Sequence, residues 1–411
     1  MKTQAAIIGG GAAGLMAAVT AAERGLGVTV IERMPRPARK LMITGKGRCN
    51  VTNNTDVRGL IAAVNRNPKF LYSAFSEFDA QATMRFFEEL GIELKTERGN
   101  RVFPVSDRAV DIVDALVNRA KALGVRFVFE RAQSVRKEAD GFLVKTDLSE
   151  IKADALLIAT GGASYPLTGS SGDGYRFAQA FSHTVTPLKP SIVPLVCFQG
   201  FVEELKGLSL KNVGITVKKQ GAKKPCYTDL GDMIFTDYGV SGPIILSASA
   251  HMSELPEKHY SLEIDLKPGL DRAKLDARLV RDFEEFSGRD LINSLDKLLP
   301  KRLIPVVVRL SGIAPHTRVA QITKEQRTKL LETLKGVRLD VIDKRPIEEA
   351  IVTSGGVKTS EINPSTMESK LCENLYFAGE IIDVDAYTGG YNLQIAFSTG
   401  HSAGKNILSK D

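Results

Sequence analysis

The stretch AAIIGGGAAGLMAAVTAAERGLGVTVIER, residues 5–33, decides the fold of this chain. Its first four residues form an apolar run that predicts a buried strand, and a glycine turn follows. A run of good helix formers then ends at Gly25, and residues 28–31 (VTVI) predict a second strand. A strand, a helix and a second strand within about thirty residues are typical of a βαβ unit with parallel strands. The stretch therefore predicts an α/β fold.

Three glycines give the first turn its chemistry. Gly9 permits the tight turn out of the strand, Gly11 lets backbone approach a pyrophosphate, and Gly14 lets the helix pack closely on the strand. The helix begins at Ala12 and Ala13, where N–H groups and a partial positive charge face the phosphate. This GxGxxG pattern between a strand and a helix predicts a Rossmann-type FAD/NAD(P)-binding domain.

Glu32 ends the second predicted strand, where a carboxylate accepts hydrogen bonds from both ribose hydroxyls of an adenosine. An acid at this position disfavours a 2′-phosphate, which argues against NADP at this site. Six Lys or Arg side chains lie between Arg33 and Arg48, without one acid among them. We interpret this basic stretch as the border of the dinucleotide phosphate.

A second glycine turn follows the apolar strand ADALLIATGG, residues 153–162. Together with Gly172-Asp173-Gly174, which opens another predicted helix, this turn resembles the corresponding segment of fumarate reductase flavoprotein subunits and their relatives. Glycines without side chains let the chain pass close to a ligand. We therefore predict cofactor contacts at Thr160, Gly161 and Gly162.

The third turn lies near the end of the chain, in YFAGE (376–380) and TGGYNLQ (388–394). In FAD enzymes of the glutathione-reductase type, Gly and an acid end a late strand, and the acid bonds the ribityl chain. The next helix points its N-terminus at the flavin pyrimidine, where free N–H groups stabilise the negative charge of reduced flavin. By this comparison Gly379 and Glu380 are the ribityl candidates. The pyrimidine candidates are Gly390, Asn392 and Leu393.

A polar loop, GKGRCN (45–50), suits a segment that lies along a flavin. With this loop, the chain resembles the BaiN/YhiN-like family of FAD-binding proteins over essentially its whole length. The segments that carry the resemblance are also SYPLTGSSGDGY (164–175), TSGGV (353–357), TMESK (366–370) and LYFAGEIIDVDAYTGGYNLQ (375–394). Members carry different labels, among them NAD(P)/FAD-dependent oxidoreductase, aminoacetone-oxidase-like protein and bile-acid reductase, so the resemblance implies FAD but no single reaction.

The resemblance also implies roles for single residues. Ala13 and Gly14 approach the pyrophosphate, Glu32 binds ribose, and Ala132 gives backbone contacts to adenine. Lys40 and the polar loop lie against the cofactor. The loop residues concerned are Gly45, Gly47, Arg48, Cys49 and Asn50.

The sequence identifies no catalytic acid or base. Arg48 is a candidate for orienting an anionic substrate, with a loop ion pair as the alternative. Tyr165 and Tyr391 are candidate proton donors, with a buried, hydrogen-bonded hydroxyl as the alternative. We interpret Cys49 as a packed thiol without a redox partner. The five histidines and four cysteines show no metal-ligand spacing, so we expect no metal site.

The 411 residues are too many for one ordinary core, and the character of the chain changes along its length. We expect the first part of an FAD-binding domain over residues 1–190. An inserted β-rich domain (191–268) and a helical subdomain (269–335) follow. Residues 336–411 are expected to return and complete the FAD-binding domain. We expect the active site where the insertion faces the flavin ring.

Composition narrows the class of protein. Hydrophobic residues make up 43% and charged residues 25%, which is ordinary for a soluble globular protein. No apolar run is long enough for a membrane span, and glycines interrupt the N-terminal apolar segment, so we expect no membrane association and no cleaved signal. The scattered cysteines favour a reducing, cytoplasmic location.

We therefore predict an oxidoreductase that holds FAD non-covalently and transfers a hydride between flavin N5 and a small organic substrate. A second GxGxxG is absent, so NAD(P)H is expected only as a transient reductant. Two alternatives stay open: an RNA-associated flavoprotein and a flavin-based redox sensor that binds a protein partner. The stretch Lys206–Lys224 holds six lysines and no acid, but we interpret it as a solvated hairpin and not as a nucleic-acid site. The oligomeric state is not indicated.

Overall fold

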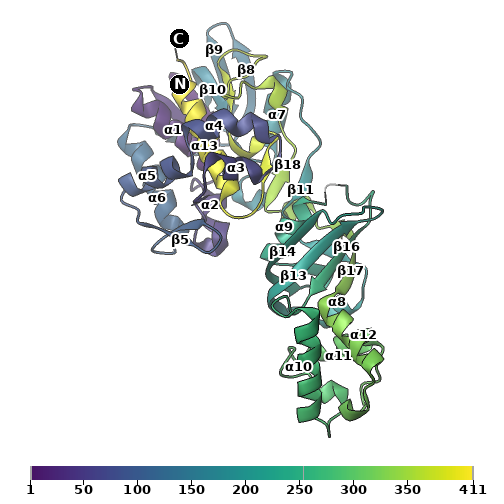
Figure 1. Ribbon diagram of the computed structural model, residues 1–411. Coiled ribbons are helices and arrows are strands. Elements are labelled where there is room, and N and C mark those ends of the chain that lie inside the picture. Colours follow the sequence, from purple (N-terminus) through teal and green to yellow (C-terminus); the bar gives the residue numbers. More distant parts are fainter. Residues whose placement is uncertain (1, 253, 410–411) are drawn as a thin grey trace. The chain divides into compact units, whose positions relative to one another are not determined.

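The chain divides into two units in the computed structural model, which describes residues 2–252 and 254–409 (Figure 1). Unit 1 comprises residues 2–191 and 346–409, and unit 2 comprises residues 192–345, counted over the described chain. Unit 1 therefore combines the two ends of the sequence, purple and yellow in Figure 1. Each unit encloses a hydrophobic core of its own.

Unit 1 is built on a seven-stranded sheet with the order β7-β2-β1-β10-β9-β8, in which β19 also pairs with β10. Five strands are parallel, whereas β8 and β9 form an antiparallel meander. The strands are β1 (Lys2–Ile8), β2 (Val28–Ile31), β7 (Arg126–Val128), β8 (Ala132–Glu138), β9 (Gly141–Thr146), β10 (Glu150–Ile158) and β19 (Leu375–Phe377).

The parallel strands end together at one edge of the sheet. Ile8 lies beside Ile31 of β2 and Ile158 of β10, and Ile158 lies beside Phe377 of β19. The chain therefore leaves all four strands at the same edge, in the turns that follow these residues. Ligands of open parallel sheets bind outside this carboxyl edge, so the register alone brings the predicted motifs together.

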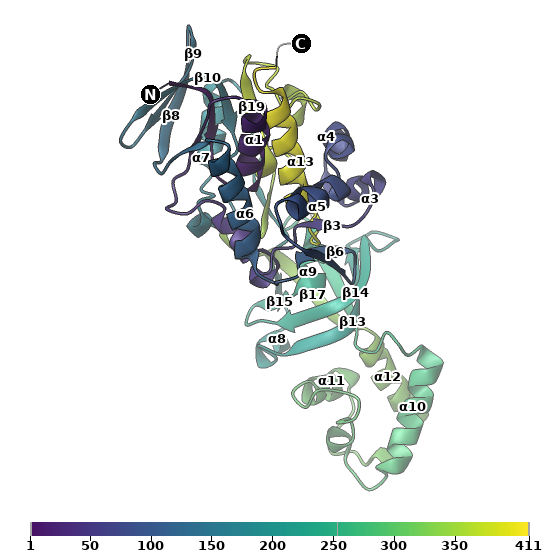
Figure 2. The ribbon, with the colours of Figure 1, turned by 90° about the vertical axis from the view of Figure 1, so that its left-hand side faces the viewer.

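Helices cover the sheet of unit 1, and α1 packs between α6 and α13 (Figure 2). The helices are α1 (Ala12–Glu23), α2 (Arg39–Ile43), α3 (Val57–Ala62), α4 (Tyr72–Glu77), α5 (Ala80–Glu89), α6 (Ala109–Ala122), α7 (Asp173–Ala180) and α13 (Tyr391–Asn406). Three small sheets complete the unit: β3 (Thr52–Asn53) with β6 (Arg101–Pro104) and β5 (Leu94–Glu97), β4 (Val64–Arg66) with β20 (Asp385–Ala386), and β11 (Lys189–Ser191) with β18 (Val352–Ser354).

Glycines on α13 let it approach α1 to backbone contact. A Cβ at Gly400 would lie 2.4 Å from the Ala13 carbonyl oxygen, and a Cβ at Gly404 would lie 2.5 Å from the Ala17 oxygen. The pairs advance together along both helices, so the helices run parallel. Because α13 starts at Tyr391, its N-terminus lies about eight residues, or about 12 Å, ahead of that of α1.

Unit 2 is a closed barrel with the order β12-β15-β14-β13-β16-β17 and a group of helices that shares its hydrophobic core. The strands are β12 (Leu195–Cys197), β13 (Ser209–Lys219), β14 (Tyr227–Phe235), β15 (Gly239–Ser241), β16 (Tyr260–Asp265) and β17 (Val337–Lys344). The helices are α8 (Phe201–Glu204), α9 (Pro243–Ala250), α10 (Arg272–Glu285), α11 (Ile304–Ser311) and α12 (Lys324–Lys335). None of the helices in the described residues has the length and apolar content needed to cross a bilayer.

This division differs from the expected boundaries in one respect. β17 closes the barrel between β16 and β12, although the range 336–411 was expected to return to the FAD-binding domain. Its alternating apolar and polar residues bury one face in the barrel. The helices within 269–335 share one core with the barrel, because their leucines pack against the barrel strands, so both belong to one unit.

Gly400→Val is expected to lower the free energy of unfolding by about 3 kcal/mol, because its side chain would force α13 away from α1. Chemical denaturation followed by circular dichroism measures the loss. Gly269→Val is the matched control, since a Cβ at Gly269 meets no atom within 4 Å. Equal stability of the two variants would show that α1 and α13 are not in tight contact.

Candidate functional site

The turn from β1 into α1 has the geometry of a phosphate site. Gly9 has φ +104°, which favours glycine, and a Cβ there would lie 2.4 Å from the Ala159 oxygen. A Cβ at Gly14 would lie 1.9 Å from the Gly9 oxygen, whereas one at Gly11 would meet nothing within 4 Å. α1 has no side-chain cap and no acid in its first turn, so the N–H groups at Ala12 are not offset by a carboxylate.

Glu32 lies beside this turn and is buried. One carboxylate oxygen accepts from the Gly10 N–H at 2.7 Å, and the other accepts from the Met34 N–H at 2.8 Å. Burial raises the pKa of Glu32 above its ordinary value, while these amide hydrogen bonds oppose the rise. Each oxygen keeps a second lone pair, so the carboxylate is fixed in place and still able to accept from ribose hydroxyls.

Arg33 and Ala132 are brought together at the same end of the site. Arg33 donates to the Ser171 hydroxyl at 2.5 Å and to Asp173 at 3.3 Å. Arg131 pairs with the same Asp173 at 3.0 Å, and Ala132 follows it as the first, buried residue of β8. One carboxylate, Asp173, thus joins Arg33, which follows the predicted ribose contact Glu32, to Arg131, which precedes the predicted adenine contact Ala132.

Glu380 lies in a network that the motifs did not reveal. One oxygen accepts from Lys40 Nζ at 2.6 Å, and the other accepts from the Ser164 hydroxyl at 3.0 Å and the Thr353 N–H at 2.8 Å. A Cβ at Gly162 would lie 2.4 Å from the Thr353 Oγ1 atom, so the glycine turn is pressed against this network. Lys40 and Glu380 are each about four-fifths buried, which holds the pair in place.

The ATGG turn at the sheet edge (residues 159–162) and the start of α13 complete the elongated site. Thr160 and Gly161 follow β10, beside Gly379 after β19. Gly390 has φ +100°, and a Cβ there would lie 2.3 Å from the Thr52 backbone. α13 has no side-chain cap and no acid in its first turn, as α1 has none.

Asn392 and Leu393 begin α13, but the Asn392 side chain is already engaged. Its Oδ1 accepts from the Ala386 N–H at 3.0 Å, and its Nδ2 donates to the Ala386 oxygen at 2.7 Å. The side chain thus fixes the loop before the helix. Backbone N–H groups, and not the Asn392 amide, are the donors that this helix offers a ligand.

The polar loop holds residues with separate surroundings. Arg48 pairs with Glu97 and with Asp107 at 2.7 Å, and its guanidinium lies 4.1 Å from the centroid of the Phe103 ring. This is the loop ion pair that the sequence left open beside a substrate role. Gly45 packs against the same ring, with 3.0 Å between its would-be Cβ and Phe103, and Gly47 is exposed.

Cys49 is fully buried in a hydrophobic cluster, and burial raises the pKa of its thiol to about 12. A thiol in this state is neither a redox nucleophile nor an attachment point for a flavin at neutral pH. The packed-thiol interpretation therefore fits the structure.

The two tyrosine candidates, Tyr165 and Tyr391, are half-buried. Tyr165 has φ +52° at the start of a short turn, and Tyr391 opens α13. Burial raises the pKa of Tyr391 above its ordinary value. A third tyrosine, Tyr175, was not predicted: its hydroxyl is buried without a hydrogen-bond partner in the described residues.

Several features show that the residues fit a dinucleotide. The buried Oδ1 of Asn50 and Oγ1 of Thr160 have no partner in the described part of the chain. Two uncapped helix N-termini are offset by about 12 Å along parallel helices, an offset that suits a pyrophosphate at one and a ring system at the other. These atoms would hold an elongated ligand with an anionic centre.

Ser164, Thr353 and Asn53 join the site although the sequence analysis did not name them as site residues. Ser164 and Thr353 bind Glu380, and Asn53 Nδ2 donates to the Gly389 oxygen at 3.0 Å. Ser164 and Thr353 stand in quoted segments with glycine turns, and Asn53 follows the polar loop by three residues. Hydroxyl and amide residues next to such turns are the signal that could have found them.

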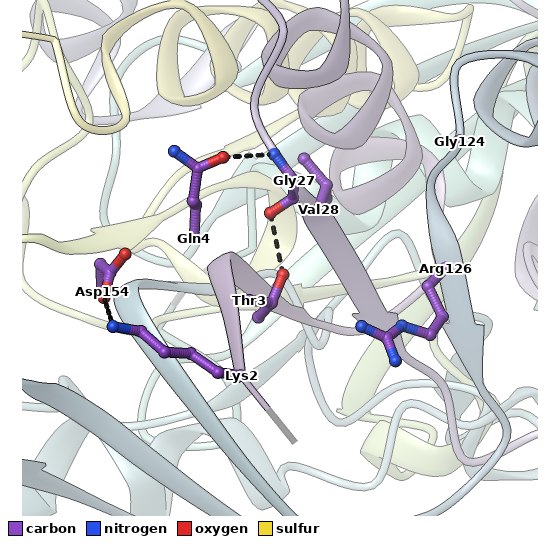
Figure 3. A pocket seen from close by; sticks show the side chains of 8 residues that line it. All are labelled: Lys2, Thr3, Gln4, Gly27, Val28, Gly124, Arg126 and Asp154. Carbon is purple, nitrogen blue, oxygen red and sulfur yellow. Dashed lines mark hydrogen bonds and ion pairs between the residues drawn. The ribbon is translucent and has the colours of Figure 1, made fainter.

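A hollow at the opposite edge of the sheet is separate from this site (Figure 3). Gly27 closes part of it by accepting from Thr3 at 2.8 Å and donating to Gln4 at 2.7 Å. None of the predicted site residues lines this hollow. The residues that line it are Lys2, Thr3, Gln4, Gly27, Val28, Gly124, Arg126 and Asp154. Over residues 2–252 and 254–409, no group of three His, Cys, Asp or Glu residues could hold a metal ion.

Comparison with known proteins identifies the family. The family model of the HI0933-like protein Rossmann domain matches residues 3–406. The chain belongs to this family. It is 29% identical over 408 residues to the 3-dehydro-bile acid delta(4,6)-reductase of Clostridium scindens, with 97% of each chain covered. It is 32% identical over 409 residues to the ribosomal RNA dihydrouridine synthase of Escherichia coli, covering 99% of this chain and 98% of the relative.

Solved structures agree on the fold of the HI0933-like protein. The 3-ketosteroid-delta4-(5alpha)-dehydrogenase of Rhodococcus jostii RHA1 superposes with a TM-score of 0.54 at 15% identity, covering 100% of this chain and 97% of that one. The predicted resemblance and the predicted fold class are confirmed. The assignment to FAD-dependent oxidoreductases is confirmed as well.

Cys49 is expected to resist alkylation by iodoacetamide in the folded protein at about pH 8, because burial keeps its thiol protonated and out of reach. Cys226, which is exposed, serves as the internal control and should be labelled. Peptide mass spectrometry compares the two sites. Labelling of Cys49 at the rate of Cys226 would mean that the loop opens.

Proposed function

We propose that this HI0933-like protein binds FAD non-covalently along the carboxyl edge of its sheet and transfers a hydride between flavin N5 and a substrate. The observation that carries the proposal is the pair of parallel helices, α1 and α13, whose uncapped N-termini are offset by about 12 Å along the helix axes. When bound, FAD supplies the two-electron chemistry.

The chain's own residues bind and orient the cofactor. Glu32 accepts from the adenosine ribose, and the N–H groups at the start of α1 bind the pyrophosphate. Glu380, fixed by Lys40, faces the ribityl hydroxyls. The N–H groups at Asn392 and Leu393 would stabilise the negative charge of reduced flavin on its pyrimidine edge, which would favour hydride transfer to N5.

The substrate proposed is a molecule with a carbon–carbon double bond conjugated to a carbonyl. The names of two full-length relatives, a delta(4,6)-reductase of 3-dehydro-bile acids and a dihydrouridine synthase, both describe saturation of such a ring bond. A small enone is the first candidate, because the sequence shows no RNA-binding motif. Neither name describes the oxidation of an amine.

Uracil in RNA is the second candidate. It is favoured by the 32% identity to a ribosomal RNA dihydrouridine synthase and by the charge of unit 2, which has 25 Lys and Arg against 20 Asp and Glu. The stretch Lys206–Lys224 contributes less uncompensated positive charge than its composition suggests, because half of its lysines are paired with acids. The pairs are Lys206 with Asp237, Lys218 with Glu263 and Lys219 with Glu254.

Glu32→Gln is expected to raise the Kd for FAD about tenfold or more, because a carboxamide nitrogen would face an N–H donor and one ribose acceptor would be lost. Titration of the apoprotein, followed by flavin fluorescence, measures the affinity. Glu138→Gln, at an exposed ion pair of β8, is the control and should leave the Kd unchanged. An unchanged Kd in Glu32→Gln would remove the ribose role from Glu32.

The reaction is tested by anaerobic stopped flow with NADH or NADPH, followed by a 3-oxo-Δ4 steroid or a uridine-containing ribosomal RNA fragment. Flavin absorbance is expected to bleach with a nicotinamide and to recover with the substrate, with one double bond reduced for each flavin reoxidised. Recovery with RNA alone would select the second candidate. Absence of recovery with either acceptor would reject the proposed substrate class.

A further inference from the structure

The tip of the β5–β6 hairpin is fixed beside the start of α13. Asn53 Nδ2 donates both to the Gly99 oxygen, at 2.9 Å, and to the Gly389 oxygen, at 3.0 Å. The Asn54 N–H donates to the Asn100 oxygen at 2.7 Å. One amide nitrogen therefore joins the hairpin tip to the turn before α13, where the pyrimidine edge of a flavin is proposed to lie.

Three cations, which we call the basic tip, stand on segments that meet here: Arg98 and Arg101 lie on the β5–β6 hairpin, and Lys46 follows Gly45, which packs on Phe103 of β6. All three are exposed, and none has a carboxylate partner among the described residues. Two contacts within the hairpin orient the Arg101 side chain. Its Nε donates to the Arg98 oxygen at 3.1 Å, and its guanidinium lies 5.8 Å from the Phe103 ring centroid. Gly45, next to Lys46, packs on the same ring.

The neighbouring acids do not neutralise the basic tip. Glu97 and Asp107 are already engaged by Arg48, and Asp107 also accepts from Lys95 at 2.8 Å. Two acids are therefore balanced by two bases, which leaves the basic tip with three uncompensated positive charges. Arginines and lysines in such an arrangement favour an oxyanion, and a guanidinium binds a carboxylate or a phosphate through two parallel hydrogen bonds.

We infer that the basic tip binds an oxyanion of the substrate at the mouth of the flavin site. This inference rests on the proposed function and narrows it to substrates that carry a carboxylate or a phosphodiester. The shared chemistry fits both named relatives, since a bile acid and an RNA are each anionic. Lys46, Arg98 and Arg101 then act as specificity-determining residues and take no part in hydride transfer.

The test removes two of the three charges with Arg98→Ala/Arg101→Ala in the FAD-loaded, full-length protein. Equilibrium binding is followed by perturbation of the flavin spectrum, first with a 3-oxo-Δ4 bile acid and its uncharged methyl ester, then with an oligouridylate. The variant is expected to raise the Kd of the anionic probe about tenfold and to leave the ester unchanged. KM should rise with the Kd, and kcat should stay within about twofold.

A control variant, Arg85→Ala/Lys121→Ala, removes the same charge from α5 and α6, where both side chains are exposed and without an acidic partner among the described residues. It should leave every Kd unchanged. The conservative variant Arg98→Lys/Arg101→Lys should restore most of the affinity, and thermal unfolding checks that all variants fold.

The outcomes separate the two possible sources and the two proposals. A loss confined to the bile acid assigns the tip to a carboxylate, and a loss confined to the oligouridylate, steeper at low salt, assigns it to a phosphodiester. Three results would overturn the inference and leave hydride transfer intact. They are equal Kd values in wild type and variant, an equal loss of affinity in the control variant, and no binding of either probe by the wild type. A protein that binds no flavin overturns the proposed function as well.

Discussion

The contact between α1 and α13 is the constraint on which the rest of unit 1 depends. Gly400 and Gly404 let the two helix backbones touch, and this contact fixes the register between the first and the last segments of the chain. The register sets the distance between two uncapped helix N-termini, one after β1 and one after the Gly389–Gly390 turn. A ligand that needs an anion site and a second donor site some 12 Å further along the helix axes is thereby selected by backbone geometry.

Two carboxylates near the pair of helices, Glu32 and Glu380, are held in place by the protein itself. Glu32 is oriented by two backbone amides, and Glu380 by Lys40 and by hydroxyl and amide donors. Side chains held in this way lose little freedom on binding, which is the physical meaning of preorganisation. By contrast, the side chains of the basic tip remain exposed, as suits a surface that meets different substrates.

Much of this organisation could be predicted from the sequence, because glycine turns after apolar strands have few structural solutions. The turns at Gly9, Thr160 and Gly379 lie at one sheet edge as expected. Contacts between distant segments could not be predicted. Nothing local to Lys40 indicates Glu380, and nothing local to Asn53 indicates Gly99. The place of β17 was also missed, because an alternating strand does not reveal which sheet it joins.

The most direct test is a structure of the protein with FAD bound. The account predicts the pyrophosphate within hydrogen-bonding distance of the N–H groups at Ala12 and Ala13, and the flavin pyrimidine within the same distance of those at Asn392 and Leu393. Glu32 should meet the adenosine ribose. FAD bound with its flavin away from the start of α13, or bound outside the carboxyl edge of the sheet, would contradict the account.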